Sequence, residues 1–160
     1  MLVEKCKLDN VFIIHLDKAV DVRGYFIETY NEKMYQKLGI NAKFVQDDLS
    51  VSRHNVFRGI HGDARTWKLI DCLYGEIYFV VVDKEKKEHE SFILSSMSGL
   101  QILVPPNFGN GYLVLSDWAT FHYKQSTYYG EYKQFTIKYN DPLYKIHLPI
   151  SNPILSERDL

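Results

Sequence analysis

The sequence has little cysteine, no long apolar run and almost no net charge. Cys6 and Cys72 lie far apart without CxxC spacing, so the chain offers neither a zinc knuckle, nor a redox pair, nor a disulfide scaffold. The 19 Lys and Arg nearly balance the 20 Asp and Glu, which argues against a nucleic-acid partner or a polybasic membrane-binding surface. The longest apolar run, Ile77–Val82, is too short to span a bilayer, and Met1–Asn10 lacks the apolar core of a signal peptide. We therefore expect a cytoplasmic protein.

Nothing in the sequence marks a domain boundary. There is no Gly/Ser linker, low-complexity tract or fixed-period repeat. With 46% apolar residues, a chain of 160 residues can bury roughly two-thirds of the surface that its unfolded form exposes. We expect one globular domain over residues 1–160.

Short runs rich in Val, Ile, Phe, Tyr and Thr predict a succession of β-strands. The runs are Val11–Leu16, Gly24–Tyr30, Phe44–Ser50, Val56–His61, Trp67–Leu73, Glu76–Val82, Ser91–Ser95, Gln101–Val104, Gly111–Ser116, Thr120–Ser126 and Gln134–Tyr139. Only Glu32–Leu38, between the cap candidate Asn31 and Gly39, predicts a helix. Tyr74-Gly75-Glu76 predicts a tight turn, and Pro105 through Gly111 an ordered loop. This pattern favours an all-β sandwich or barrel.

Part of a cupin metal motif is visible in the second half of the chain. Gly99, Pro105 and Asn110 follow its spacing, but Asn110 stands where a metal-binding histidine is expected. The first cupin motif is also incomplete, because no second histidine lies two residues after His61. A neutral amide is a poor ligand for zinc, iron or copper. We expect a cupin-type β-barrel (jelly roll) with one or two short helices and no metal site.

A longer series of motifs resembles the dTDP-4-dehydrorhamnose 3,5-epimerase family nearly from end to end. The motifs, in family order, are Asp21-x-Arg23-Gly24-Tyr25-Phe26-x-Glu28, Phe44-Val45-Gln46-Asp47, Arg58-Gly59-Ile60-His61, Lys68-Leu69, Tyr74-Gly75-Glu76, Gly111-Tyr112-Leu113, Tyr123-Lys124-x3-Tyr128-Tyr129, Asn140-Asp141-Pro142 and Leu155-Ser156-Glu157-Arg158-Asp159. The resemblance implies an epimerase that needs no cofactor and acts beside the C4 ketone of a nucleotide-linked sugar.

The resemblance also implies catalytic roles. His61 matches the base that removes the α-proton, and an imidazole with a pKa of about 6.5 suits that task. Asp141 matches the aspartate that hydrogen-bonds the base, although Asn140-Asp141-Pro142 is also an ordinary turn sequence. Tyr123 matches the proton donor on the opposite face of the sugar ring, and Lys68 matches the group beside the keto oxygen.

The substrate-binding positions follow from the same resemblance. The expected set is Arg23, Phe26, Glu28, Gln46, Arg58, Asn110 and Tyr129, with the two arginines suited to the pyrophosphate. Strict strand alternation would place Arg58 and His61 on opposite faces, so we expect a bulge at Gly59 that turns both inward. The family is usually dimeric with a strand shared between barrels, so we also expect a homodimer.

Several positions depart from the family pattern. The family loop Gly-Phe-Ala-His-Gly-Phe reads Asn107-Phe108-Gly109-Asn110-Gly111-Tyr112, so an amide replaces a histidine that lines the family site. The motif Arg58-Gly59-Ile60-His61-Gly62-Asp63 resembles that of the family branch that epimerises GDP-linked 4-keto-heptoses for bacterial capsules. We take a GDP-linked 4-keto-heptose as the expected substrate class. The alternatives are a dTDP-4-keto-6-deoxyglucose 3,5-epimerase of rhamnose synthesis, a 3,4-ketoisomerase and a non-catalytic nucleotide-sugar binding module.

Overall fold

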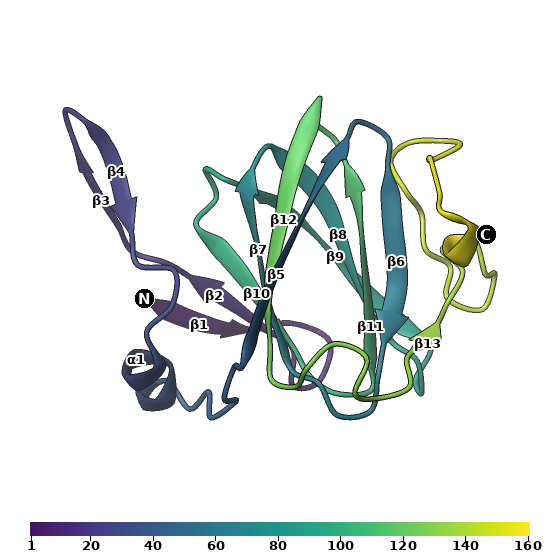
Figure 1. Ribbon diagram of the computed structural model, residues 1–160, viewed down its shortest axis with the longest axis horizontal. Helices are drawn as coiled ribbons and strands as arrows, with labels where there is room; N and C mark the ends of the chain where they lie inside the picture. Colours follow the sequence, from purple (N-terminus) through teal and green to yellow (C-terminus); the bar gives the residue numbers. More distant parts are fainter.

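Two β-sheets face each other in the computed structural model, which describes residues 1–160 (Figure 1). The elements run in the order β1 (Leu2–Lys5), β2 (Phe12–His15), β3 (Lys18–Asp21), β4 (Gly24–Ile27), α1 (Glu32–Lys37), β5 (Gln46–Arg53), β6 (Phe57–Gly62), β7 (Lys68–Tyr74), β8 (Glu76–Asp83), β9 (Glu88–Ser95), β10 (Leu100–Val104), β11 (Phe108–Val114), β12 (Trp118–Gln125), β13 (Phe135–Thr136) and the 3-10 turn η1 (Glu157–Asp159). The six-stranded sheet has the order β1-β2-β10-β7-β12-β5, and the five-stranded sheet has the order β13-β6-β11-β8-β9.

This architecture confirms the predicted all-β class with its short helices. Asn31 caps α1 by accepting a hydrogen bond from the backbone N–H of Met34, as expected. The two sheets are not joined into one continuous hydrogen-bonded barrel. Strands β1 and β3 were not predicted, because both are largely exposed and lack the alternation of buried and exposed residues that a sequence pattern detects. α1 has six residues, and no helix is long and apolar enough to cross a membrane.

The loop predicted from Pro105 through Gly111 is wrong beyond Asn107, because β11 begins at Phe108. The glycines that suggested a loop lie within the strand and allow β6 to approach it closely. A Cβ atom at Gly111 would lie 2.9 Å from the carbonyl oxygen of Arg58, and one at Gly109 would lie 2.6 Å from Cγ2 of Ile60. These glycines therefore mark close packing of strands and not a turn.

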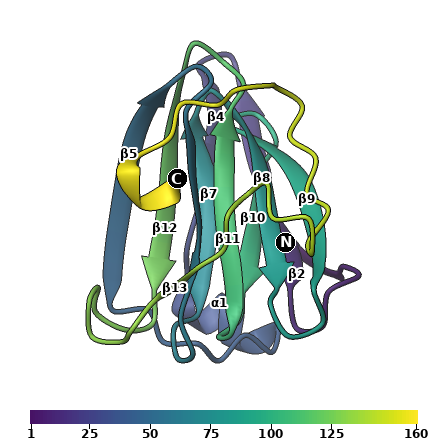
Figure 2. The same ribbon diagram turned by 90° about the vertical axis from the view of Figure 1, so that its right-hand side faces the viewer.

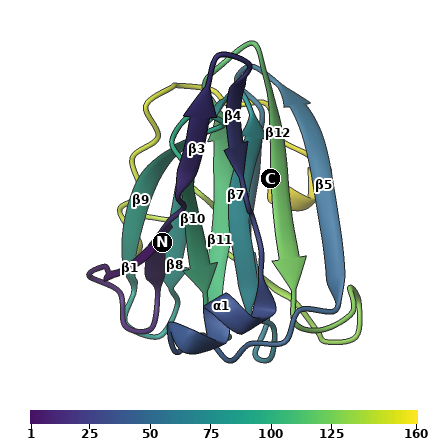
Figure 3. The same ribbon diagram turned by 90° about the vertical axis from the view of Figure 1, so that its left-hand side faces the viewer.

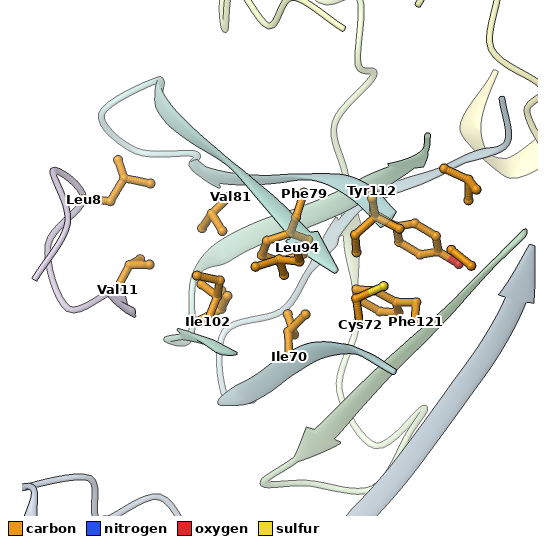
Figure 4. Packing of buried hydrophobic residues seen from close by; sticks show 14 residues of the cluster. Leu8, Val11, Ile70, Cys72, Phe79, Val81, Leu94, Ile102, Tyr112 and Phe121 are labelled. Atoms are coloured by element: carbon orange, nitrogen blue, oxygen red, sulfur yellow. The ribbon is translucent and has the colours of Figure 1, made fainter. Parts of the chain in front are cut away.

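The main core fills the space between the sheets (Figure 4). Ile70 and Ile102 of the six-stranded sheet and Phe79 and Val81 of the five-stranded sheet are completely buried in it. A second apolar cluster lies on the outer face of the five-stranded sheet, which the C-terminal segment crosses (Figure 2). A third lies on the outer face of the six-stranded sheet, where α1 packs (Figure 3). The chain therefore forms layers on both sides of the two sheets.

The β3–β4 hairpin projects away from both sheets (Figures 1 and 3). A buried polar network on the outer face of the six-stranded sheet fixes the base of the hairpin. The side-chain amide of Gln101 donates to the carbonyl oxygen of Thr29 at 2.9 Å and to Asp71 at 2.8 Å. Asp71 is in turn 2.9 Å from Nδ1 of His122, and the hydroxyl of Tyr35 donates to Gln101. The segment after β4 is thereby bonded to the sheet.

Candidate active site

A cavity of about 280 Å³ opens between the two sheets. Its lining comes from β5, β7 and β12 of one sheet, from β6 and β11 of the other, from the loop after β12 and from η1. The lining includes six of the residues expected from the sequence, namely Arg58, His61, Lys68, Asn110, Tyr123 and Tyr129. Positions scattered over more than 70 residues of sequence are therefore brought together at one place in the fold.

A register shift in β6 places both Arg58 and His61 in this cavity. His61 pairs with Asn110 and Arg58 pairs with Tyr112, so three steps along β6 oppose two along β11. The intervening Ile60 points to the other side of the sheet, where it is fully buried in the outer apolar cluster. The bulge predicted at Gly59 is confirmed, and it overcomes the strict alternation that would have separated the two side chains.

His61 is held by a buried carboxylate from the C-terminal turn. Nε2 of His61 lies 2.7 Å from Oδ1 of Asp159, whose side chain is only 3% exposed. The other oxygen of Asp159 accepts a hydrogen bond of 2.9 Å from the hydroxyl of Ser156. The backbone of Ile154 bonds to Asn55 and Phe57 beside β6, and this contact brings η1 to the rim of the cavity.

The prediction that Asp141 holds His61 is wrong. Asp141 lies in a turn of the C-terminal segment, and its carboxylate accepts the backbone N–H of Leu143 at 3.0 Å. An aspartate before proline satisfies its oxygens locally in this way. The aspartate that contacts His61 comes instead from the end of the chain, at Asp159.

The environment of His61 favours the neutral imidazole. Burial is the largest influence and lowers the pKa of His61, the nearby positive charge of Arg158 lowers it further, and the Asp159 carboxylate opposes both. Because Asp159 holds Nε2, the ring nitrogen left for a ligand in the cavity is Nδ1. The side chain is 21% exposed, so that ligand can reach it. A neutral, oriented imidazole of this kind is suited to accept a proton.

Lys68 is a buried cation with few partners. It begins β7 and is 7% exposed, and its ammonium group donates one hydrogen bond, of 3.1 Å, to the side-chain oxygen of Asn110. Burial lowers the pKa of Lys68 to about 8, although the carboxylate of Asp63 acts in the opposite direction. An ammonium group has three N–H donors, so Lys68 retains donors for an oxygen atom of a ligand.

Tyr123 faces the cavity from the sheet opposite to His61. On β12 it alternates with His122 and Lys124, and it packs against the core between the sheets. Burial raises the pKa of Tyr123 to about 12, and the charge of Asp48 on the neighbouring strand adds to the effect. The phenol therefore stays protonated at neutral pH and can act as a proton donor.

Two arginines bring positive charge to the lining. Nε of Arg58 donates to the hydroxyl of Ser52 at 2.9 Å, and the guanidinium of Arg158 donates to the side-chain oxygen of Gln134 at 2.6 Å. Gln46 lies beside the cavity and not in its lining, and its oxygen accepts the backbone N–H of Tyr129 at 2.8 Å.

Three of the expected binding residues are far from this lining. Arg23 and Phe26 lie on the projecting hairpin, Glu28 follows it, and none of the three contributes to the cavity. Phe26 is 71% exposed, and the side chain of Arg23 pairs only with Asp21 of the same hairpin. Within one chain, these residues do not belong to the site.

An imidazole held by a carboxylate, a phenol on the opposite wall and a buried ammonium group are groups suited to acid–base chemistry, and they lie on an all-β, cupin-like scaffold. No group of three or more His, Cys, Asp or Glu side chains is arranged to hold a metal ion. The sequence pattern of the dTDP-4-dehydrorhamnose 3,5-epimerase family matches residues 5–160, and the chain belongs to this family. It is an isomerase of the epimerase type.

Individual relatives agree with this assignment. The chain is 36% identical to the dTDP-4-dehydrorhamnose 3,5-epimerase of Salmonella typhimurium, with 99% of this chain and 92% of the relative covered. A crystal structure of the Elizabethkingia anophelis enzyme of that name is 38% identical with a TM-score of 0.90, and covers 99% of this chain and 93% of that one. The Legionella pneumophila dTDP-6-deoxy-D-glucose-3,5-epimerase, solved with dTDP-4-keto-L-rhamnose, is 34% identical with a TM-score of 0.92, over 99% and 89% of the two chains.

Sequence patterns did not reveal the roles of the C-terminal turn or of two further lining residues, Ser50 and Tyr112. Ser156, Arg158 and Asp159 belong to the closing motif Leu155–Asp159, which by itself assigns them no role. That motif was the available signal in the sequence. Ser50 and Tyr112, which also line the cavity, gave no comparable signal because alternation alone does not identify their partners.

We expect Asp159→Asn to lower kcat on the order of 100-fold or more, because the amide neither fixes the imidazole tautomer nor stabilises the imidazolium. Asp141→Asn is the matched control. It keeps an oxygen that can accept the N–H of Leu143, so its kcat should stay within about twofold of the original chain. Steady-state rates of both variants test the assignment. A larger loss for Asp141→Asn than for Asp159→Asn would contradict it.

The pH profile of kcat/KM should fall on its alkaline side near the Lys68 pKa of about 8. Lys68 carries its charge below that pH and loses it above, so stabilisation of a negative oxygen decreases as pH rises. On the acid side, activity should fall below the ordinary histidine value, because burial lowers the pKa of His61. Rates measured from pH 5 to 10 test both limbs. A profile that stays flat from pH 7 to 9.5 would exclude the role of Lys68.

Proposed function

We propose that this epimerase inverts a carbon beside the C4 ketone of a nucleotide-diphosphate-linked 4-keto sugar, with His61 as the base and Tyr123 as the acid. The observation that carries the proposal is the position of these two side chains on opposing sheets around one cavity. Inversion requires removal of a proton from one face of the sugar ring and its return to the other face. A base and an acid on opposite walls meet that requirement.

In the first step, Nδ1 of His61 takes the proton from the carbon next to the ketone. The electron pair of the broken C–H bond forms the enolate double bond, and the carbonyl electrons move to the oxygen. Lys68 then donates to this oxygen, and its position against Asn110 directs the ammonium group into the cavity. Asp159 stabilises the imidazolium formed at His61.

In the second step, the electrons return from the oxygen and the carbon takes the phenolic proton of Tyr123 on the opposite face. The resulting tyrosinate and imidazolium regain their original states by exchanging protons with solvent. The raised pKa of Tyr123 keeps the phenol protonated until the enolate has formed. Asn110 is neutral, so the charge on the enolate is balanced chiefly by Lys68.

The preferred substrate in this proposal is dTDP-4-keto-6-deoxyglucose, the alternative to the GDP-linked heptose that the motifs predict. The family description and the relatives named above all specify dTDP sugars, and they give no support to the GDP-linked heptose expected from the motif wording. Relatives differ in the carbons that their names give as epimerised. The relative from Streptomyces niveus, 29% identical over 95% of this chain, is named a dTDP-4-dehydrorhamnose 3-epimerase, whereas the family description names both C3 and C5. We propose inversion at both C3 and C5.

The proposal is tested by incubating the protein in deuterated water with dTDP-4-keto-6-deoxyglucose and following C3 and C5 by NMR. Deuterium should enter both positions, and His61→Asn should abolish exchange. A GDP-4-keto-heptose is tested in parallel, and faster exchange with it would overturn the proposed identity of the nucleotide and of the sugar. A product with its carbonyl at C3 would identify a ketoisomerase. Binding without exchange of either substrate would identify a binding module.

The projecting hairpin supports a further part of the proposal, a homodimer. Val20 and Phe26 of the hairpin are 75% and 71% exposed, and Leu49 and Val51 on the edge strand β5 are 62% and 54% exposed. An unpaired edge strand with exposed apolar residues favours association with another strand. In a two-fold dimer each hairpin would lie against β5 of the other chain, which brings Arg23, Phe26 and Glu28 toward the partner's cavity.

Mixing two inactive variants tests this arrangement. His61→Asn removes the base, and the double change Arg23→Ala with Phe26→Ala removes the hairpin contacts. In a hybrid dimer, one cavity receives an intact base from one chain and an intact hairpin from the other. Activity should therefore rise after the mixture is dissociated and reassociated, and sedimentation should give a dimer. A monomer, or a mixture no more active than its parts, would exclude hairpin exchange.

A further inference from the structure

A chain of hydroxyl groups runs along one wall of the cavity and ends at Arg58. Nε of Arg58 lies 2.9 Å from Oγ of Ser52, this oxygen lies 3.2 Å from the hydroxyl of Tyr112, and that hydroxyl lies 2.7 Å from Oγ of Ser50. Ser52 and Tyr112 are each 3% exposed, although the Tyr112 side chain borders the cavity, whereas Arg58 is an exposed residue and Ser50 lines the cavity. Two buried groups thus connect two groups that a ligand can reach.

The direction of these hydrogen bonds follows from the chemistry of arginine. A guanidinium group only donates, so Ser52 must accept from Arg58. The hydroxyl proton of Ser52 is buried, and Tyr112 is the acceptor within reach. The phenolic proton of Tyr112 is then directed to Ser50. This order satisfies every buried donor, whereas the reverse order leaves the proton of Ser52 without an acceptor.

The order has two consequences for the cavity. Because Nε is engaged by Ser52, the terminal N–H groups of Arg58 remain for a ligand, with the plane of the guanidinium fixed. Because Ser50 accepts from Tyr112, its own proton is left to donate into the cavity. A fixed arginine fork and a hydroxyl donor on the same wall fit the oxygens of a diphosphate.

We propose that Tyr112 is a positioning residue whose hydroxyl, through Ser52 and Ser50, holds Arg58 in the orientation that binds the diphosphate of the substrate. The inference rests on the proposed function for the identity of that group. It goes beyond that function because it assigns diphosphate recognition to a buried residue that does not itself contact the phosphates. The chain of hydroxyl groups depends on tyrosine at this position, because a phenylalanine would offer neither an acceptor for Ser52 nor a donor for Ser50.

Tyr112→Phe is a clean test because the ring has its own packing. The Tyr112 ring stacks on Phe121 with a centroid separation of 4.2 Å and an interplanar angle of 13°. Removing the hydroxyl leaves that stack in place and takes away only the acceptor of Ser52 and the donor to Ser50. The matched control is Tyr78→Phe, since the Tyr78 hydroxyl also bonds a serine, Ser91 at 2.8 Å, but lies outside the cavity lining.

The measurement is calorimetric affinity for TDP and for TMP, with GDP and GMP in parallel, together with kcat and KM in the exchange assay. For Tyr112→Phe we expect about tenfold weaker TDP binding, a smaller change for TMP, a raised KM and a nearly unchanged kcat. Ser52→Ala should show the same loss, and the double variant should lose no more than either single one, because the hydroxyls act as one unit. Tyr78→Phe should bind both nucleotides like the original chain.

Equal losses for TDP and TMP, additive losses in the double variant, or unchanged TDP affinity in Tyr112→Phe would each overturn the proposal. If Tyr112→Phe does not fold, Ser50→Ala at the cavity end of the chain takes its place, with the same expected loss of preference for the diphosphate. Deuterium exchange in the unmodified chain distinguishes failure of the proposed function from failure of the role proposed for Tyr112. Absence of exchange in that chain would overturn the epimerase reaction, whereas the affinity ratios still decide the role of Tyr112.

Discussion

The site depends on the bulge in β6 and on the close approach of β6 and β11 that accompanies it. A regular strand would direct Arg58 and His61 to opposite faces, and one of them would leave the cavity. The register shift keeps both in the cavity and sends Ile60 into the outer apolar cluster. The approach requires glycine on both strands, because a Cβ at Gly59 would lie 2.6 Å from Cα of Gly111. Packing of two backbones therefore sets the positions of the functional side chains.

The C-terminal segment completes the site after crossing the molecule. It covers the outer face of the five-stranded sheet with apolar side chains and then returns beside β6, where Asp159 contacts His61 (Figure 2). The stability of this segment and the orientation of the imidazole are thus coupled. A carboxylate that is 3% exposed is costly to bury without partners, and His61 and Ser156 together provide them. Burial of the apolar segment and pairing of the polar group support each other.

The cavity combines charged and neutral groups in a way that suits transient negative charge. Lys68 is buried among few partners, and the residue opposite His61 is the neutral Asn110, so the positive charge close to His61 comes from Arg158 and Lys68. The two arginines are held by other partners, Arg58 by Ser52 and Arg158 by Gln134. Separate anchors for the cations allow one part of a ligand to be bound tightly while another part reacts.

Much of the fold and part of the site followed from the sequence. Short runs of apolar residues predicted most of the strands. The ordered motifs identified the family and six residues that share one site, namely His61, Lys68, Tyr123, Arg58, Asn110 and Tyr129. The bulge at Gly59 was also predicted, because two residues with related functions had the wrong spacing for one face. The loop expected at Gly109 and Gly111 was wrong, since glycine marks a turn and a close strand approach equally well.

The sequence by itself determined the all-β class, the family and the residues that strand periodicity directs inward. Only the tertiary structure decided that Asp159 and not Asp141 holds His61, that the hairpin residues lie outside the cavity of their own chain, and that Tyr112 connects Ser52 to Ser50. The physical reason is the range of the interactions. Periodicity and turn preferences act over a few residues, whereas a hydrogen bond between His61 and Asp159 spans 98 positions and forms only when both sheets and the C-terminal segment have packed.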